Sequence, residues 1–166
     1  MTNELSTLAA LLGREHWRVE SVTVRIHVLR MAIGGEWPGS LDDADAGLAD
    51  AVDRLRQEEL ARAVVANGCG ARYGLDGEPT LSELVAHASD DAATALLGAA
   101  DGLAVAIEAA RAAAAEATAR LDDAAYDRPS GSVTSAVTPS RAAARARLLQ
   151  RVVPPSIDHF LAQRVG

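Results

Sequence analysis

The segment from residue 5 to residue 33 carries a heptad pattern that constrains the fold more than any other feature of the sequence. Apolar residues recur in alternating steps of three and four at Leu5, Leu8, Leu12, Val19, Val22, Ile26, Leu29 and Ile33. Such a pattern is typical of a long amphipathic helix whose apolar stripe packs against other helices. Because a lone helix would leave this stripe in water, we expect at least one partner helix of similar length.

Glu15 occupies the one position of this stripe that is not apolar. A buried carboxylate is costly unless it is paired. Two structural interpretations are open: Glu15 lies at an edge that solvent reaches, or it meets an arginine across the bundle. A functional role is the third alternative.

A second long helix is predicted after a turn at residues 34–39. That turn reads GGEWPG, and paired glycines followed by proline end a helix. Ser40 and the aspartates after it have the character of a helix N-cap and first turn. We expect this helix to reach about Asn67 and to form an antiparallel hairpin with the first.

The stretch GLDGEPTLSELV at residues 74–85 is interpreted as the start of a short helix. Thr80 and Glu83 have the spacing of a capping box, which predicts a helix over 81–88. A phosphate-binding loop is disfavoured, because no strand precedes the glycines and no Lys-Ser/Thr pair follows them.

The next long helix is predicted from Ser89 onward. Its apolar stripe again advances in steps of three and four, and half of it is alanine: Leu96, Ala100, Leu103, Ile107, Ala110, Ala114, Ala117 and Leu121. Small residues in a stripe permit close helix approach or leave a groove for another segment. Alanine methyls bury little apolar area, so we expect modest stability at the 110–121 end.

Composition supports the same fold class. Hydrophobic residues make up 49% of the chain but aromatic residues only 3%. This balance favours helix packed on helix over a sheet. We therefore predict an all-α fold: an antiparallel helical hairpin or bundle of three long helices, with short helices and a C-terminal tail.

Charge divides the chain into an acidic body and a basic tail. Residues 1–127 carry 10 arginines against 22 acidic residues, a net charge of −12, whereas residues 128–166 carry 6 arginines against the single Asp158, a net charge of +5. We predict a helical body over 1–127, a polar linker over 128–139 and an amphipathic tail over 140–166. Nucleic-acid binding by the body is disfavoured, because binding to phosphates requires a cationic face.

The tail contains two short amphipathic pieces separated by Pro154 and Pro155. Ser140 is the expected cap of a helix over 141–153, and a last turn or two follows Ser156. Two arrangements are open: the tail folds back onto the acidic body, or it stays free and orders on another protein's helix. Its apolar residues are candidates for partner binding: Leu148, Leu149, Val152, Val153, Ile157, Phe160 and Leu161.

Nothing in the residue pattern favours an enzyme, a metal site or a cofactor. The four histidines His16, His27, His87 and His159 form no i,i+4 pair, and no cysteine cluster accompanies them. Cys69, the only cysteine, is expected to be a small buried thiol or, as the glycines around it suggest, part of a mobile loop. It cannot form an internal disulfide.

We also expect a cytoplasmic protein that is not inserted in a membrane. The N-terminal segment has no basic region before an apolar stretch, and no long uncharged apolar window occurs.

Three stretches together resemble the FlgN-type flagellar export chaperones. They are LLGRE at residues 11–15, RLRQEELAR at 54–62 and YGLDGEPTLSEL at 73–84. The similarity in helix lengths, spacings and short strings covers roughly residues 5–130. It implies an all-helical cytoplasmic protein without catalytic activity.

The family resemblance also implies partners. Such chaperones bind the helical C-terminal segments of hook–filament junction proteins, prevent their early assembly and deliver them to the flagellar type III export gate. Their C-terminal segment engages the cargo, which here corresponds to the apolar tail residues named above. Tyr126 resembles, by position, a tyrosine associated with docking at the gate. A structural role at the bundle end is the alternative for Tyr126.

A different function remains open at this point. A non-flagellar helical adaptor or scaffold, acting through homodimerisation or by capturing a partner helix, has the same sequence properties.

Overall fold

The protein is described by a computed structural model that covers residues 2–126 and 139–161. Within those ranges every regular element is a helix and no strand occurs, so the all-α prediction is confirmed. In chain order the helices are α1 (Thr2–Ile33), α2 (Leu41–Tyr73), α3 (Leu81–Ala86), α4 (Asp90–Tyr126), α5 (Pro139–Gln150) and α6 (Pro155–Leu161).

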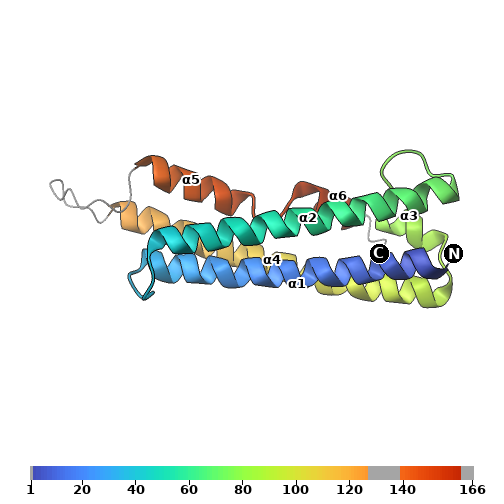
Figure 1. The fold of residues 1–166 in the computed structure, drawn as a ribbon, viewed down its shortest axis with the longest axis horizontal. Helices are drawn as coiled ribbons and strands as arrows, with labels where there is room; N and C mark the ends of the chain where they lie inside the picture. The colour runs from blue at the N-terminus through green and yellow to red at the C-terminus, as the bar shows by residue number, and fades with distance from the viewer. Residues whose placement is uncertain (1, 127–138, 162–166) are drawn as a thin grey trace.

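Three long helices, α1, α2 and α4, form an elongated bundle (Figure 1). α1 and α2 are antiparallel, and the short α3 returns the chain at the far end, so that α4 runs parallel to α1. Two ion pairs fix this parallel register: Arg30 with Glu116 at 2.7 Å and Arg120 with Glu36 at 3.0 Å. The predicted hairpin and its third long helix are therefore present.

The heptad stripe of α1 forms the centre of the core. Leu8, Leu12, Val19, Val22 and other stripe residues are fully buried, and α1 packs along both α2 and α4. The alanine-rich stripe of α4 faces α1 in the same core. Close helix approach follows because methyl groups occupy little space between the two backbones.

α2 is longer than the sequence suggested. It continues through Gly68 and Gly70 to Tyr73 instead of ending near Asn67. Gly70 lets Pro79 pack closely on the helix, because a Cβ atom there would lie 3.0 Å from the proline Cγ. The helix ends at Gly74, whose φ of 73° is the left-handed conformation that glycine favours.

The expectation that Cys69 lies in a mobile loop is wrong, because the residue is on α2 and buried. Burial also raises the pKa of its thiol, and the Glu4 carboxylate acts in the same direction. A raised pKa keeps the thiol protonated, which disfavours a nucleophilic role.

The start of α3 is as predicted, although the helix ends two residues early, at Ala86. The hydroxyl oxygen of Thr80 accepts a hydrogen bond from the Glu83 backbone N–H, and the Thr80 backbone N–H donates to the Glu83 carboxylate at 2.8 Å. The hydrogen bonds from the Thr80 backbone and hydroxyl lower the pKa of Glu83. The glycine-rich stretch is thus the connection into a capped helix.

The tail folds back onto the body in two pieces. α5 ends at Gln150 and not at Val153, so that Val152 and Val153 lie in the turn before Pro154. Figure 1 shows α5 and α6 side by side with the body, running in the direction of α2. Together they act as a broken fourth helix of the bundle.

α4 also satisfies the length and composition criteria for a membrane-spanning helix over residues 90–124, with a mean hydropathy of 1.4. The central helix of a soluble bundle shares these properties. In this structure the apolar stripe of α4 packs into the core against α1.

Candidate functional site

The surface of the body beneath α5 and α6, which we call the tail seat, is the candidate functional site. It follows the groove between α2 and α4, and its polar anchors on the body are Asp42, Asp45, Arg62 and Arg111. The tail touches the body far less extensively than the three long helices touch one another. The tail nevertheless buries Leu149, Val152, Ile157 and Phe160 on this surface, so the seat combines apolar burial with ion pairs.

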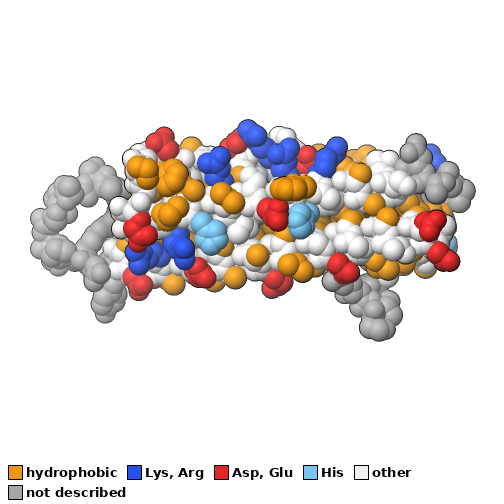
Figure 2. Space-filling view, turned by 90° about the horizontal axis from the view of Figure 1, so that it is seen from below, with side chains coloured by type: hydrophobic (Ala, Val, Ile, Leu, Met, Phe, Trp, Pro, Cys, Tyr) orange, Lys and Arg blue, Asp and Glu red, His pale blue; other side chains and the backbone are white. Residues whose placement is uncertain are grey.

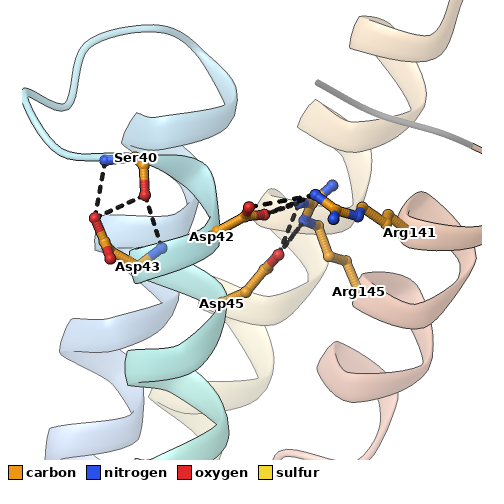
Figure 3. Close-up of polar contacts among 6 residues, drawn as sticks. All are labelled: Ser40, Asp42, Asp43, Asp45, Arg141 and Arg145. Atoms are coloured by element: carbon orange, nitrogen blue, oxygen red, sulfur yellow. Dashed lines mark hydrogen bonds and ion pairs between the residues drawn. The ribbon is translucent and has the colours of Figure 1, made fainter. Parts of the chain in front are cut away.

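Two aspartates at the start of α2 hold the start of α5 (Figure 3). Asp42 accepts from Arg141 at 3.0 Å, and Asp45 accepts from the Arg145 Nε at 2.8 Å and 2.9 Å. Arg145 is only 2% exposed, so its contact with Asp45 is largely shielded from solvent. The attraction between opposite charges is stronger where solvent is excluded than at an exposed site.

A capping box explains why these two aspartates are free to face the tail. The Ser40 hydroxyl accepts from the Asp43 backbone N–H at 3.0 Å, and the Asp43 carboxylate accepts from Ser40 in return. Asp43 is thereby engaged at the helix start. Figure 3 shows Asp42 and Asp45 pointing the other way, toward α5.

The middle of the seat is apolar. Leu149 and Val152 of the tail are buried against the body, and Ala114, Ala115 and Thr118 of α4 line the adjoining groove. A second groove of about 530 Å³ opens beside the Pro154 turn, where Leu60 and Ala63 of α2 are among its lining residues. Leu60 is 67% exposed.

The far end of the seat is a buried ion pair covered by an aromatic ring. The Arg62 Nε donates to Glu15 Oε1 at 3.0 Å, and the two side chains are 1% and 0% exposed. The Phe160 ring of α6 lies over the guanidinium, 4.4 Å from ring centroid to Arg62 Cζ. Within the described residues, Glu15 Oε2 and Arg62 Nη2 have no hydrogen-bond partner.

The second interpretation of Glu15 is therefore confirmed, because Glu15 meets an arginine, Arg62, across the bundle. Burial raises the pKa of Glu15 to about 7, and nearby Glu59 and Glu58 add to the rise, while Arg62 opposes it. Burial also raises the pKa of Glu59. A carboxyl that titrates near neutral pH inside the bundle is a source of pH-dependent stability.

A last ion pair connects α6 to α4. Arg111 donates to Asp158 at 2.6 Å, and this hydrogen bond, together with one to Glu108, raises the pKa of the arginine further. Both side chains are about half exposed, so the pair contributes little to stability. Its geometric effect is to align α6 along the body.

All the predicted partner-binding residues lie in the interface between the tail and the body. Leu149, Val152, Ile157 and Phe160 are buried, and Leu148, Val153 and Leu161 are partly buried against the core. In the closed molecule the body of the same chain covers their apolar surfaces. Tyr126 is the last residue of α4, and its side chain lies outside the described part of the structure.

Sequence reasoning missed the charged residues of the seat. Arg141 and Arg145 are spaced i,i+4 in a tail opposite in charge to the body, and that spacing could have indicated one charged face of α5. Nothing in the sequence singled out Arg62 as the partner of Glu15. That pairing depends on how α1 and α2 align.

Among the described residues no group of three or more His, Cys, Asp or Glu side chains is placed to hold a metal ion. The His87 ring stacks on Tyr73 at 4.9 Å, which is a packing contact between the end of α2 and α3.

Comparisons with known proteins return no relative: no family model, no curated protein and no solved structure matches this chain.

Proposed function

We propose that this chain is a cytoplasmic chaperone of flagellar type III export. Its cargo would be the helical C-terminal segments of hook–filament junction proteins, which it keeps from early assembly and delivers to the export gate. The observation that carries the proposal is the tail seat, a surface of α2 and α4 that an oppositely charged helical segment of the same chain covers. A groove that accepts one helix can accept another.

The capture step follows from the two surfaces that the closed molecule buries in each other. When α5 and α6 leave the seat, the groove of α2 and α4 and the apolar face of the tail become accessible. A partner helix packs in the groove, and the tail covers it with residues such as Leu148 and Val153. A segment tethered to the same chain covers the bound helix at a lower entropic cost than a separate chain would.

The flagellar part of the proposal depends on the resemblance at residues 11–15, 54–62 and 73–84. The described fold agrees with a small helical chaperone, and the acidic body suits a soluble carrier. Docking of Tyr126 at the export gate belongs to the same proposal.

Co-purification with the hook–filament junction proteins of its own organism tests the proposal. The tagged full-length chain is expected to elute with a junction protein as a stoichiometric complex on size exclusion. Leu148→Asp places a charge on the partly buried apolar face of α5 and should abolish the complex. Arg147→Ala, a change at an exposed position of the same helix, is the matched control. If the chain forms a complex with none of the junction proteins, the chaperone proposal is contradicted.

A helical adaptor or scaffold acting as a homodimer is the second candidate. Its support is the exposure of large apolar side chains on the body, above all Trp17 and Val105, each 72% exposed. Figure 2 views the side opposite the tail, where hydrophobic side chains are distributed among charged ones. Light scattering tests it: a dimer that Trp17→Ser converts to monomer would favour the scaffold.

A further inference from the structure

The two ends of the tail seat carry different charged anchors. At one end Asp42 and Asp45 face the basic pair Arg141 and Arg145. At the other end Arg62 faces the Phe160 ring. The apolar middle of the seat accepts any amphipathic helix, so these anchors determine which helix binds best.

In the closed molecule the Arg62 anchor is held by the body as well as covered by the ring. Its Nε is fixed by the buried Glu15 at 3.0 Å, and the whole side chain is 1% exposed in the closed molecule. The Nη2 group has no hydrogen-bond partner within the described residues. An oriented, desolvated guanidinium with unused donor capacity favours the face of an aromatic ring above it.

The acidic anchor is also selective. Arg145 is buried against Asp45 while Arg141 stays exposed beside Asp42, so the pair recognises cations at an i,i+4 spacing on one helix face. A neutral helix in this place would leave Asp45 shielded and unpaired, which is unfavourable.

We propose that the tail seat is a receptor for a cationic amphipathic helix that ends in an aromatic residue, and that α5 and α6 occupy it as an internal mimic of that helix. The ligand carries two basic residues spaced i,i+4, an apolar face, and an aromatic side chain that reaches Arg62. Asp45 and Arg62 lie on one helix, about 26 Å apart along its axis at 1.5 Å per residue. An unbroken partner helix therefore needs about 17 residues between its basic pair and its aromatic residue.

This inference rests on the proposed helix capture, but not on the flagellar identity of the partner. It states the chemistry of the ligand, whereas the proposed function states where the ligand comes from. The tail itself has this chemistry, so a labelled peptide with the sequence of residues 139–161 serves as the probe.

The test measures binding of the peptide to the full-length chain by fluorescence anisotropy. A chain opened by Arg141→Ala and Asp158→Asn, two exposed changes that loosen its own tail, is compared with the native chain. The opened chain should bind the peptide about threefold more tightly, because loss of two exposed ion pairs modestly weakens the competing tethered tail. Circular dichroism verifies that both chains are equally helical.

Variant peptides then measure how much each anchor contributes to peptide binding. Arg145→Ala should weaken peptide binding about tenfold, because it leaves Asp45 shielded and unpaired. Phe160→Leu, which keeps an apolar residue but loses the ring, should weaken it about threefold. Arg147→Ala, a change at an exposed position of the peptide's helix, is the matched control and should bind like the unchanged peptide.

Three results would overturn the inference. The first is no binding of the peptide to the opened chain. The second is equal binding of the Arg145→Ala and Phe160→Leu peptides and the unchanged peptide. The third is a concentration-dependent dimer of the opened chain that excludes the peptide, which would identify the occupant as the tail of a second copy.

A competition experiment separates this inference from the proposed function. Excess tail peptide should displace a junction protein from its complex with the full-length chain. A complex that forms but resists the peptide would overturn the receptor chemistry and leave the chaperone proposal intact. Peptide binding with no junction-protein complex would overturn the chaperone proposal alone.

Discussion

At the scale of single residues, the buried pair of Glu15 and Arg62 is the most consequential feature. Glu15 lies inside the heptad stripe of α1, where an apolar residue would pack more simply, and Arg62 reaches it from α2. A buried ion pair is weak evidence for stability, because desolvation offsets the attraction of the charges. Its value here is specificity: it fixes the alignment of α1 with α2 and orients the guanidinium beneath α6.

The raised pKa of Glu15 predicts a pH-dependent stability. The folded value of about 7 lies above the ordinary value of 4.5, so the folded state binds more protons than the unfolded state between these values. Stability from this group is therefore present at low pH and lost as the pH rises through 7. Relative to Glu15→Gln, the native chain should lose on the order of 3 kcal/mol between pH 5 and pH 8.

Urea unfolding of both chains across this pH range provides the measurement. The glutamine variant keeps the side-chain shape and removes the titration, which makes it the matched control for other titrating groups. Parallel stability curves for the two chains would contradict the assignment of the pH dependence to Glu15.

Removing the arginine of the pair should be more harmful than removing both charges. Arg62→Ala leaves Glu15 buried without its partner and takes away the surface beneath Phe160. We expect a loss of about 3–5 kcal/mol in the free energy of unfolding. Arg62→Met combined with Glu15→Leu should recover most of it, because apolar side chains then fill the space. Denaturant titration measures both, and equal losses for the single and double variants would contradict this account.

At the scale of elements, the tail helices differ from the long helices in what holds them. α1, α2 and α4 are held by a continuous apolar core, whereas α5 and α6 combine a few buried residues with arginine–carboxylate pairs. Most of these pairs are partly exposed and are screened by salt within about 8 Å at physiological ionic strength. Salt should therefore act more strongly on the tail than on the apolar interior of the body.

Hydrogen exchange measured at low and high salt tests this difference. Amides near Leu149 should exchange faster when the salt concentration is raised, while amides around Val22 in the middle of α1 should not change. Asp42→Asn should produce part of the same effect at low salt, because it removes the partner of Arg141. Equal responses of tail and body would show that the apolar contacts alone hold the tail.

At the scale of the whole molecule, the chain is a three-helix body completed by a broken fourth helix. The core of the body lies mainly between α1 and its two long neighbours, and Leu149, Val152, Ile157 and Phe160 of the tail extend it. Removing residues 139–166 should thus leave a helical, cooperatively unfolding body. The truncated chain should be less stable, because Arg62 and the groove of α4 lose their cover.

Circular dichroism measures the helicity of the truncated chain, and thermal unfolding measures its cooperativity and its loss of stability. Loss of helicity in residues 1–127 would show that the tail is an integral part of the fold and not a detachable segment. That result would also weaken the proposed capture mechanism, which requires the body to stay folded when the seat opens.

Much of the architecture was predictable from local pattern. The stripes at Leu5 to Ile33 and Leu96 to Leu121 identified two of the long helices, since burial repeats with the helical period. The cap at Thr80 placed the start of α3. The end of α2 was not predictable in this way, because the glycine at residue 70 makes room for Pro79 and does not end the helix.

The sequence by itself determined the helices, the acidic body and the basic amphipathic tail, because periodicity, capping and charge are properties of neighbouring residues. Only the tertiary structure decided that Glu15 meets Arg62, that Phe160 covers the pair, and that Arg145 is buried against Asp45. These contacts join residues far apart in the chain. Their existence depends on the relative alignment of whole helices, which no local pattern specifies.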